Sequence, residues 1–250
     1  MFLILLFIAV APGLFLLWYF YHRDKYEREP KKLLFKIFFF GSLTVIPAII
    51  FELILEKVFN AFTSGIINVF LVCFIVIGPV EEILKYFVVR NWAYNRPEFN
   101  EIMDGIVYAV SASLGFATLE NIMYVLSNGL GVGVLRAFLA VPGHAMYGAI
   151  MGYFLGRAKL NCARENRLLT VGVLLAVLFH GLYDFLLLTK TALAILVIAL
   201  LVVLAIVIRK QLKRAELQSR ERKVAEDMAG ECLPPVTGNE ESEKRGTGDL

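Results

Sequence analysis

The sequence predicts an all-α protein, a polytopic transmembrane helical bundle of about seven spanning helices with its N-terminus outside and its C-terminus inside. Of the 250 residues, 58% are hydrophobic, whereas soluble domains contain about 45–50% apolar residues. The apolar residues form runs of about 18 or more, which is long enough to cross the ~30 Å hydrocarbon core of a bilayer. The protein is therefore expected in the cell membrane as a multi-pass protein.

The runs give the expected spans and their orientation. They cover residues 1–21, 33–55, 69–89, 102–126, 132–156, 169–188 and 192–208. The first run lacks the basic start and the cleavage pattern of a signal peptide, which indicates a retained anchor. Lysine and arginine gather in the loops 22–32, 90–101 and 157–168 and at the start of the tail, while the opposite loops offer only Lys57 and Lys190. The positive-inside rule then places the C-terminus in the cytoplasm.

Two regions follow from the composition. Residues 1–208 form the transmembrane bundle, with the expected catalytic helices at 69–188, and residues 209–250 form a charged cytoplasmic tail. The tail is expected to be helical over 209–227 and disordered from Gly230, where Gly, Pro, Glu and Ser dominate. Its basic start favours contact with anionic membrane lipid.

Several classes of protein are excluded by composition. The basic residues form short runs rather than one broad patch, which argues against nucleic acid as a partner. The three cysteines form no CxxC pair and no ligand spacing, which excludes a disulfide framework or a zinc finger.

The third to sixth spans carry ionisable residues that a membrane helix normally avoids. A charge at the bilayer centre costs at least about 2.5–3.5 kcal/mol. These residues are Glu81, Glu82, Lys85, Asp104, Glu120, Arg136, His144, His180 and Asp184. So many charges on four consecutive helices are too costly to serve only as ion pairs between helices.

Depth in the membrane brings several of these residues together. Glu81 and His144 each lie ~18 Å along spans that run inward, and His180 lies ~17 Å along a span that runs outward. The same count puts Glu120 ~27 Å along its span, outside the common level unless that helix is tilted or begins earlier. Asp104 lies too near the membrane surface for the site, and it is expected to stabilise the start of its helix or to form an ion pair. The sequence thus predicts a site that holds Glu81 and Glu82 with both histidines.

Spacing on single helices adds supporting residues. Glu81 and Lys85 share a helix face at i, i+4, so Lys85 can compensate one carboxylate. His180 and Asp184 share a face in the same way, so Asp184 can orient the imidazole.

Such a set suits the activation of water. A carboxylate can act as general base, and imidazoles can polarise water, stabilise an oxyanion or bind zinc. His144, His180 and one glutamate, such as Glu82, would give catalytic zinc its usual three protein ligands. The spacing differs from the HExxH motif, so it leaves zinc-bound and glutamate-activated water both open. The sequence contains no GxSxG motif, which argues against a serine nucleophile. Cys73 lies away from the cluster, which argues against a cysteine nucleophile.

Four short motifs resemble one family. They are EEILK at 81–85, FATLEN at 116–121, Gly143-His144 followed by Gly148, and HGLYD at 180–184. In this order they are similar to the motifs of the PrsW family of intramembrane proteases, which are distantly similar to the CAAX prenyl proteases.

The resemblance implies an enzyme, an intramembrane peptidase of the metallo or glutamic type. It implies a membrane-anchored protein substrate, with an anti-sigma factor in envelope-stress signalling as the family's expected target. It also implies Glu81, Glu82, Glu120, His144 and His180 as catalytic residues, with Lys85, Asn121, Tyr183 and Asp184 in support.

Two other functions compete with the protease. A proton-coupled transporter also lines its path with buried acids and histidines. Against it, the two halves of the chain show no internal repeat, and the fifth and sixth spans are expected to be continuous. A membrane scaffold without activity is the third possibility, and an intact set of two glutamates and two histidines argues against it.

Overall fold

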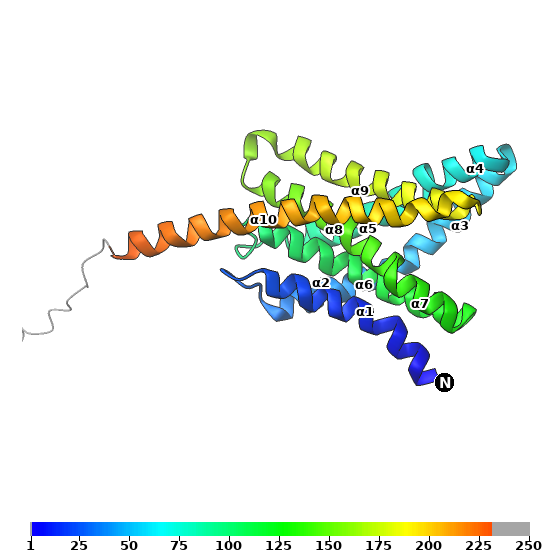
Figure 1. The fold of residues 1–250 in the computed structure, drawn as a ribbon. Helices are drawn as coiled ribbons and strands as arrows, with labels where there is room; N and C mark the ends of the chain where they lie inside the picture. The colour runs from blue at the N-terminus through cyan, green and yellow to red at the C-terminus, as the bar shows by residue number, and fades with distance from the viewer. Residues whose placement is uncertain (1, 232–250) are drawn as a thin grey trace, which may run out of the picture.

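The computed structural model describes residues 2–231, which form only helices and the turns between them (Figure 1). Seven helical segments within this range are long and apolar enough to cross a membrane, as the sequence predicts. The helices are α1 (Phe2–Arg23), α2 (Lys31–Leu43), α3 (Val45–Phe62), α4 (Gly65–Leu71), α5 (Gly78–Trp92), α6 (Ile102–Asn128), α7 (Leu130–Phe138), α8 (Ala140–Lys159), α9 (Glu165–Leu188) and α10 (Leu196–Glu231). Three short helical segments complete the order: a π-helix η1 (Val72–Ile77) and the 3₁₀-helices η2 (Cys162–Arg164) and η3 (Ala192–Ile195).

Three of the seven spans are interrupted, each shortly before a proline. The second span breaks at Thr44 before Pro47, and the third widens into the π-helix η1 before Pro79. The fifth span, expected to be continuous, breaks at Leu139 before Pro142. Proline lacks the N–H that bonds to the carbonyl four residues earlier, and its ring clashes with that carbonyl. The prediction of a continuous fifth span is therefore wrong.

The centre of the bundle is α6. Its side chains from residue 103 to residue 118 are all buried, and it is apolar around most of its circumference, as expected for a helix enclosed by others. Gly148, Gly152 and Gly156 of α8 face its first half, where a methyl group on any of them would crowd the backbone of α6 or a side chain on it. Small residues at this spacing let two membrane helices approach closely.

The outer helices present large apolar side chains on their exposed surfaces. Phe7 of α1, Leu53 of α3 and Val203 of α10 are each more than half exposed. Such a surface would be unfavourable in water, but it matches the hydrocarbon core of a bilayer. The fold is therefore a polytopic membrane bundle.

The last helix, α10, continues without a break past the expected boundary at residue 208 and projects beyond the bundle (Figure 1). It leaves the bundle at the end that carries the loops 24–30, 93–101 and 160–161, named the basic end below. There Glu216 pairs with Arg23 at 2.6 Å, and Arg222 donates to the backbone of Asn100. Except for Gly230 and Glu231, which belong to α10, the tail predicted to be disordered lies outside the described residues.

Candidate active site

The start of α5 supplies a buried triad of charges. Glu81 and Glu82 follow Pro79 in the first turns of the helix, and Lys85 lies one turn further along. The Nζ atom of Lys85 lies 2.9 Å from Oε2 of Glu81 and 2.8 Å from Oε1 of Glu82. All three side chains are buried, so the lysine compensates two carboxylates that have lost most of their contact with water.

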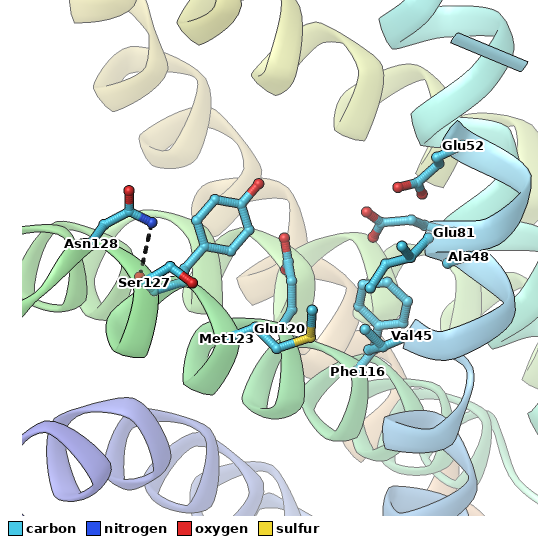
Figure 2. A pocket seen from close by; sticks show the side chains of 11 residues that line it. Val45, Ala48, Glu52, Glu81, Phe116, Glu120, Met123, Ser127 and Asn128 are labelled. Carbon is cyan, nitrogen blue, oxygen red and sulfur yellow. Dashed lines mark hydrogen bonds between the residues drawn. The ribbon is translucent and has the colours of Figure 1, made fainter. Parts of the chain in front are cut away.

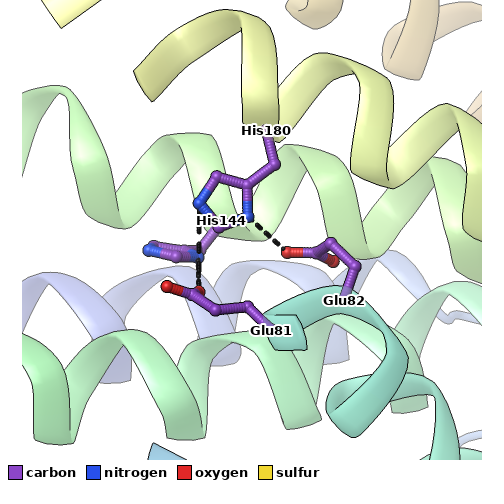
Figure 3. A group of neighbouring side chains, drawn as sticks. All are labelled: Glu81, Glu82, His144 and His180. Carbon is purple, nitrogen blue, oxygen red and sulfur yellow. Dashed lines mark hydrogen bonds and ion pairs between the residues drawn. The ribbon is translucent and has the colours of Figure 1, made fainter. Parts of the chain in front are cut away.

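Two histidines from two other helices complete the cluster (Figure 3). The His180 Nδ1 atom on α9 lies 2.9 Å from Oε1 of Glu82, and the His144 Nδ1 atom on α8 lies 3.1 Å from Nζ of Lys85. Oε2 of Glu81 faces both imidazoles at 3.9 Å. The expectation that depth brings these four residues together is confirmed.

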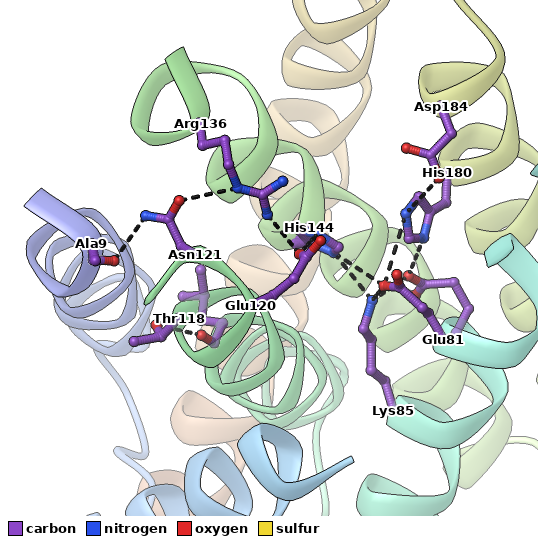
Figure 4. Close-up of polar contacts among 12 residues, drawn as sticks. Ala9, Glu81, Lys85, Thr118, Glu120, Asn121, Arg136, His144, His180 and Asp184 are labelled. Atoms are coloured by element: carbon purple, nitrogen blue, oxygen red, sulfur yellow. Dashed lines mark hydrogen bonds and ion pairs between the residues drawn. The ribbon is translucent and has the colours of Figure 1, made fainter. Parts of the chain in front are cut away.

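A third carboxylate reaches the cluster from α6 (Figure 4). Oε2 of Glu120 lies 3.0 Å from Nε2 of His144 and 2.7 Å from the guanidinium of Arg136. Depth counted from Ile102 had placed Glu120 too far outward. The count assumes that the span begins at Ile102, whereas this first turn of α6 lies at the basic end, where Glu101 approaches Arg222 of α10 at 4.0 Å.

The supporting residues also lie where the motifs place them. Asn121 accepts a hydrogen bond from Nε of Arg136 at 3.1 Å and donates one to the carbonyl of Ala9 at 2.9 Å, which fixes Arg136 beside the cluster. Oδ2 of Asp184 lies 3.3 Å from Nε2 of His180, as an ionic contact without hydrogen-bond alignment. Tyr183 is buried beside the cluster, with its ring 6.3 Å from that of Tyr147.

A cavity of about 310 Å³ opens beside the cluster, between α3 and the second half of α6 (Figure 2). Its polar wall contains Glu81 and Glu120, whereas Glu82 does not line it. The carboxylate of Glu52 on α3 lies beside that of Glu81, and Val45 and Phe116 contribute apolar surface. Of the two adjacent glutamates, Glu81 is therefore the one that the cavity reaches.

Comparison with known proteins decides between the competing functions. Residues 29–209 match the model of a family described as PrsW family intramembrane metalloproteases. The chain belongs to the PrsW family.

The PrsW relatives cover most of the chain. Protease PrsW of Geobacillus kaustophilus is 42% identical over 183 residues, which cover 73% of this chain and 79% of the relative. Protease PrsW of Bacillus subtilis is 41% identical over 180 residues, covering 72% and 80%. Protease PrsW of Clostridioides difficile is 34% identical over 197 residues, covering 76% and 82%. No solved structure gave a significant match.

The PrsW assignment makes the chain an intramembrane metallopeptidase, and the buried cluster fits a metal. One ligand atom from each of Glu81, Glu82, His144 and His180 lies within 4.8 Å of the others, and imidazole with carboxylate is a common zinc set. Oε2 of Glu82 is buried without a hydrogen-bond partner. With neutral imidazoles, the four carboxylates that lie within 4.0 Å of the two histidines (Glu81, Glu82, Glu120, Asp184) exceed the cations that pair with them (Lys85, Arg136) by two charges, which a divalent ion would balance.

Three side chains of this PrsW site lay outside the set proposed from sequence. Arg136 had been noted as a buried charge, but no spacing on one helix connects it with Glu120. Tyr147 stacks on His180 with ring centroids 5.0 Å apart, which only the tertiary structure reveals. Glu52 did carry a signal, since it is a carboxylate within an apolar span.

Proposed function

We propose that Glu81, Glu82, Glu120, His144 and His180 form the active site with which this PrsW-family enzyme hydrolyses a peptide bond of a membrane-anchored protein. The position of Glu81 carries this proposal. Glu81 is the member of the carboxylate pair that faces both imidazoles and also lines the cavity. A substrate that enters the cavity would thus reach Glu81, whose carboxylate lies 3.9 Å from each imidazole.

The two glutamates have different surroundings, which suggests different roles. Glu82 is fully buried and holds His180 and Lys85 through one oxygen, while its second oxygen is unpaired. It is suited to join His144 and His180 as a ligand. Zinc, the metal this donor set suits, would act as a Lewis acid that polarises the substrate carbonyl.

Glu81 is suited to act as the general base. Its carboxylate would accept a proton from water as the water oxygen attacks the scissile carbonyl carbon. When the C–N bond breaks, the same carboxyl group would return the proton to the leaving nitrogen. Lys85 holds the carboxylate in place at 2.9 Å. Water thus supplies the oxygen of the new C–O bond, and Glu81 carries one of its protons to the nitrogen released when the C–N bond breaks.

The remaining polar residues would position the histidines. Glu120 fixes Nε2 of His144 and is itself held by Arg136, which Asn121 orients. Asp184 lies on Nε2 of His180, and Tyr183 belongs to the same buried layer. Partners of this kind fix the orientation of a ligating imidazole and raise its basicity.

The substrate proposal rests on the cavity and on family membership. The cavity lies between helices of the membrane bundle, so it is suited to a segment of a membrane-anchored chain. A peptide bond can be attacked only when its segment is locally unwound, and the polar wall can bond such exposed backbone groups. Within the PrsW family, we favour an anti-sigma factor as the substrate, and envelope-stress signalling as the setting.

The test is cleavage by the purified protein in lipid vesicles, with a membrane-anchored reporter as substrate. Glu81→Gln keeps size and hydrogen-bonding capacity but cannot take a proton, so the rate should fall about 10²–10⁴-fold. Glu56→Gln is the matched control, because Glu56 lies on α3 one turn beyond Glu52 and does not line the cavity. Full cleavage by a stably folded Glu81→Gln/Glu82→Gln double variant would end the assignment of proteolysis to this site.

A further inference from the structure

A second group of buried carboxylates lies at the basic end, away from the active site. Asp24 follows the last residue of α1, Glu29 precedes Pro30, the N-cap of α2, and Asp104 lies in the first turn of α6. One oxygen from each lies within 4.8 Å of the others. Asp104 and Glu120 are 16 residues apart on α6, or ~24 Å along the helix, so the two clusters are separate.

No positive side chain compensates this group. Among the described residues, no lysine, arginine or histidine nitrogen lies within 4.0 Å of the carboxylates of Asp24, Glu29 or Asp104, although the same loop contains Lys25 and Arg28. Arg23, the neighbour of Asp24, turns instead to Glu216 of α10. Three ionised carboxylates this close together repel one another strongly unless a cation or protons lie between them.

Several carboxylate oxygens of this group have no hydrogen-bond partner. Oδ2 of Asp104 accepts from the backbone N–H groups of Asn100 and Glu101, at 2.7 and 2.6 Å, and Glu29 accepts from the hydroxyl of Tyr108. Both oxygens of Asp24 and Oε1 of Glu29 have no partner. The backbone N–H groups of Glu27 and Glu29 lie near Asp24 without hydrogen-bond alignment.

These unpaired oxygens are not on the surface. The exposed fraction of Asp24 is 1% and that of Glu29 is 4%. An unpaired buried carboxylate is among the most costly groups a protein can hold, so a ligand that accepts its lone pairs would be strongly favoured. The unpartnered side chain of Asp24 points into the group and is the feature that distinguishes it from an ordinary acidic surface.

We propose that Asp24, Glu29 and Asp104 bind a hard divalent cation, Mg²⁺ or Ca²⁺, at the basic end. Both ions prefer carboxylate oxygens and accept several at once, while the cluster offers no nitrogen or sulfur donor. The bound ion would tie the α1–α2 loop to the first turn of α6, the helix that carries Glu120. The ion is structural in this position, since the active site lies more than half the helix away.

The experiment measures cation binding by the full chain in detergent micelles. Equilibrium dialysis with Ca²⁺ and, separately, with Mg²⁺ is combined with thermal unfolding at the same concentrations. Wild type should bind the ion and unfold at a higher temperature in its presence, because a ligand of the folded state stabilises it. Asp24→Asn should weaken binding at least about tenfold, because it removes one of three charged ligands.

Three further variants separate this site from others. Glu27→Gln removes an exposed carboxylate from the same loop and should leave binding and its stabilising effect intact. Glu81→Gln alters the active site and should also leave them intact, which distinguishes the two clusters. Glu29→Gln keeps an acceptor for Tyr108 and replaces Asp24→Asn as the decisive variant if the latter does not fold.

Two results would overturn the proposal. One is a wild type that binds neither Ca²⁺ nor Mg²⁺ and whose unfolding temperature is unchanged by both, which would mean that the carboxyls hold protons instead. The other is Ca²⁺ or Mg²⁺ binding that is lost in Glu81→Gln and retained in Asp24→Asn, which would place the ion at the active site.

Discussion

Nε2 of His144 lies 3.0 Å from Oε2 of Glu120, a contact between α8 and α6 that links the active site to the central helix of the bundle. The same carboxylate oxygen is held by Arg136 at 2.7 Å, so the imidazole is oriented by a fixed acceptor. His144 also faces Lys85 through its other nitrogen. The orientation of this histidine is therefore set from both sides.

This contact gives the first prediction. Glu120→Gln keeps an acceptor near His144 but loses the charge that Arg136 and the imidazole share. We expect zinc affinity and cleavage rate to fall about 10–100-fold, the usual effect of losing a partner of a ligating histidine. Metal titration and the initial rate of reporter cleavage are the measurements. Unchanged zinc affinity would remove Glu120 from its positioning role.

The second prediction separates the two adjacent glutamates by metal content. Wild type should contain about one equivalent of zinc, bound by three protein ligands. Glu82→Gln and replacement of either His144 or His180 by alanine should deplete it, whereas Glu81→Gln should retain it and lose activity. Elemental analysis of the purified variants is the measurement. Full zinc in Glu82→Gln, or activity that survives exhaustive chelation, would contradict the proposed ligand set.

The third prediction concerns stability. Lys85→Met removes the cation that lies between two buried carboxylates and leaves their charges uncompensated. We expect a loss of about 3–5 kcal/mol in the free energy of unfolding, typical of a broken buried ion pair. Thermal or denaturant unfolding in detergent measures it. Addition of Glu81→Gln should recover part of the loss, because it removes one stranded charge, and strict additivity of the two changes would contradict the coupling.

The fourth prediction concerns orientation, which the loop charges suggest. A reporter fused after Leu250 should be cytoplasmic, and a tag placed before Met1 should be accessible from outside intact cells. The basic end and the carboxylates of Asp24 and Glu29 would then face the cytoplasm. A tag at Met1 that is protected from outside reagents would overturn this arrangement.

The fifth prediction is a pH dependence of stability in the absence of divalent cations. Burial, followed by the nearby carboxylate of Asp104, raises the pKa of Asp24 to about 7 and that of Glu29 to about 10. A carboxyl with a raised pKa stabilises the folded state most at low pH, and this contribution is lost as pH rises. The unfolding temperature of wild type should therefore fall from about pH 5 to about pH 9, and that of Asp24→Asn should fall less. If the unfolding temperatures of wild type and Asp24→Asn fell equally with pH, Asp24 would not be the titrating group.

Much of this architecture could be predicted from sequence, because the membrane restricts what a chain can do. Backbone polar groups must be satisfied within each span, so long apolar runs become helices, and all seven were found. Because a charge in lipid is costly, the ionisable residues Glu81, Glu82, His144 and His180 stood out as candidates. The rise per residue of a helix then placed all four at one depth. Both arguments depend only on solvent and helix geometry.

The rest depended on information that a single helix does not contain. The position of Glu120 was misjudged because its depth was counted from Ile102, whereas the first turn of α6 packs at the basic end, where Glu101 approaches Arg222 of α10. The break at Leu139 follows from Pro142, but proline within a membrane helix can also be tolerated without a break, as Pro12 shows in α1. The partnership of Arg136 with Glu120 and the stacking of Tyr147 on His180 join separate helices and arise only from packing.

The π-helix Val72–Ile77 sets the direction in which the carboxylate pair points. A π-turn closes over one residue more than an α-turn, so everything after it is turned by about 100° relative to a uniform helix. A regular α-helix with the same number of residues would turn Glu81 and Glu82 by about this angle, away from the two histidines, while leaving the span almost as long.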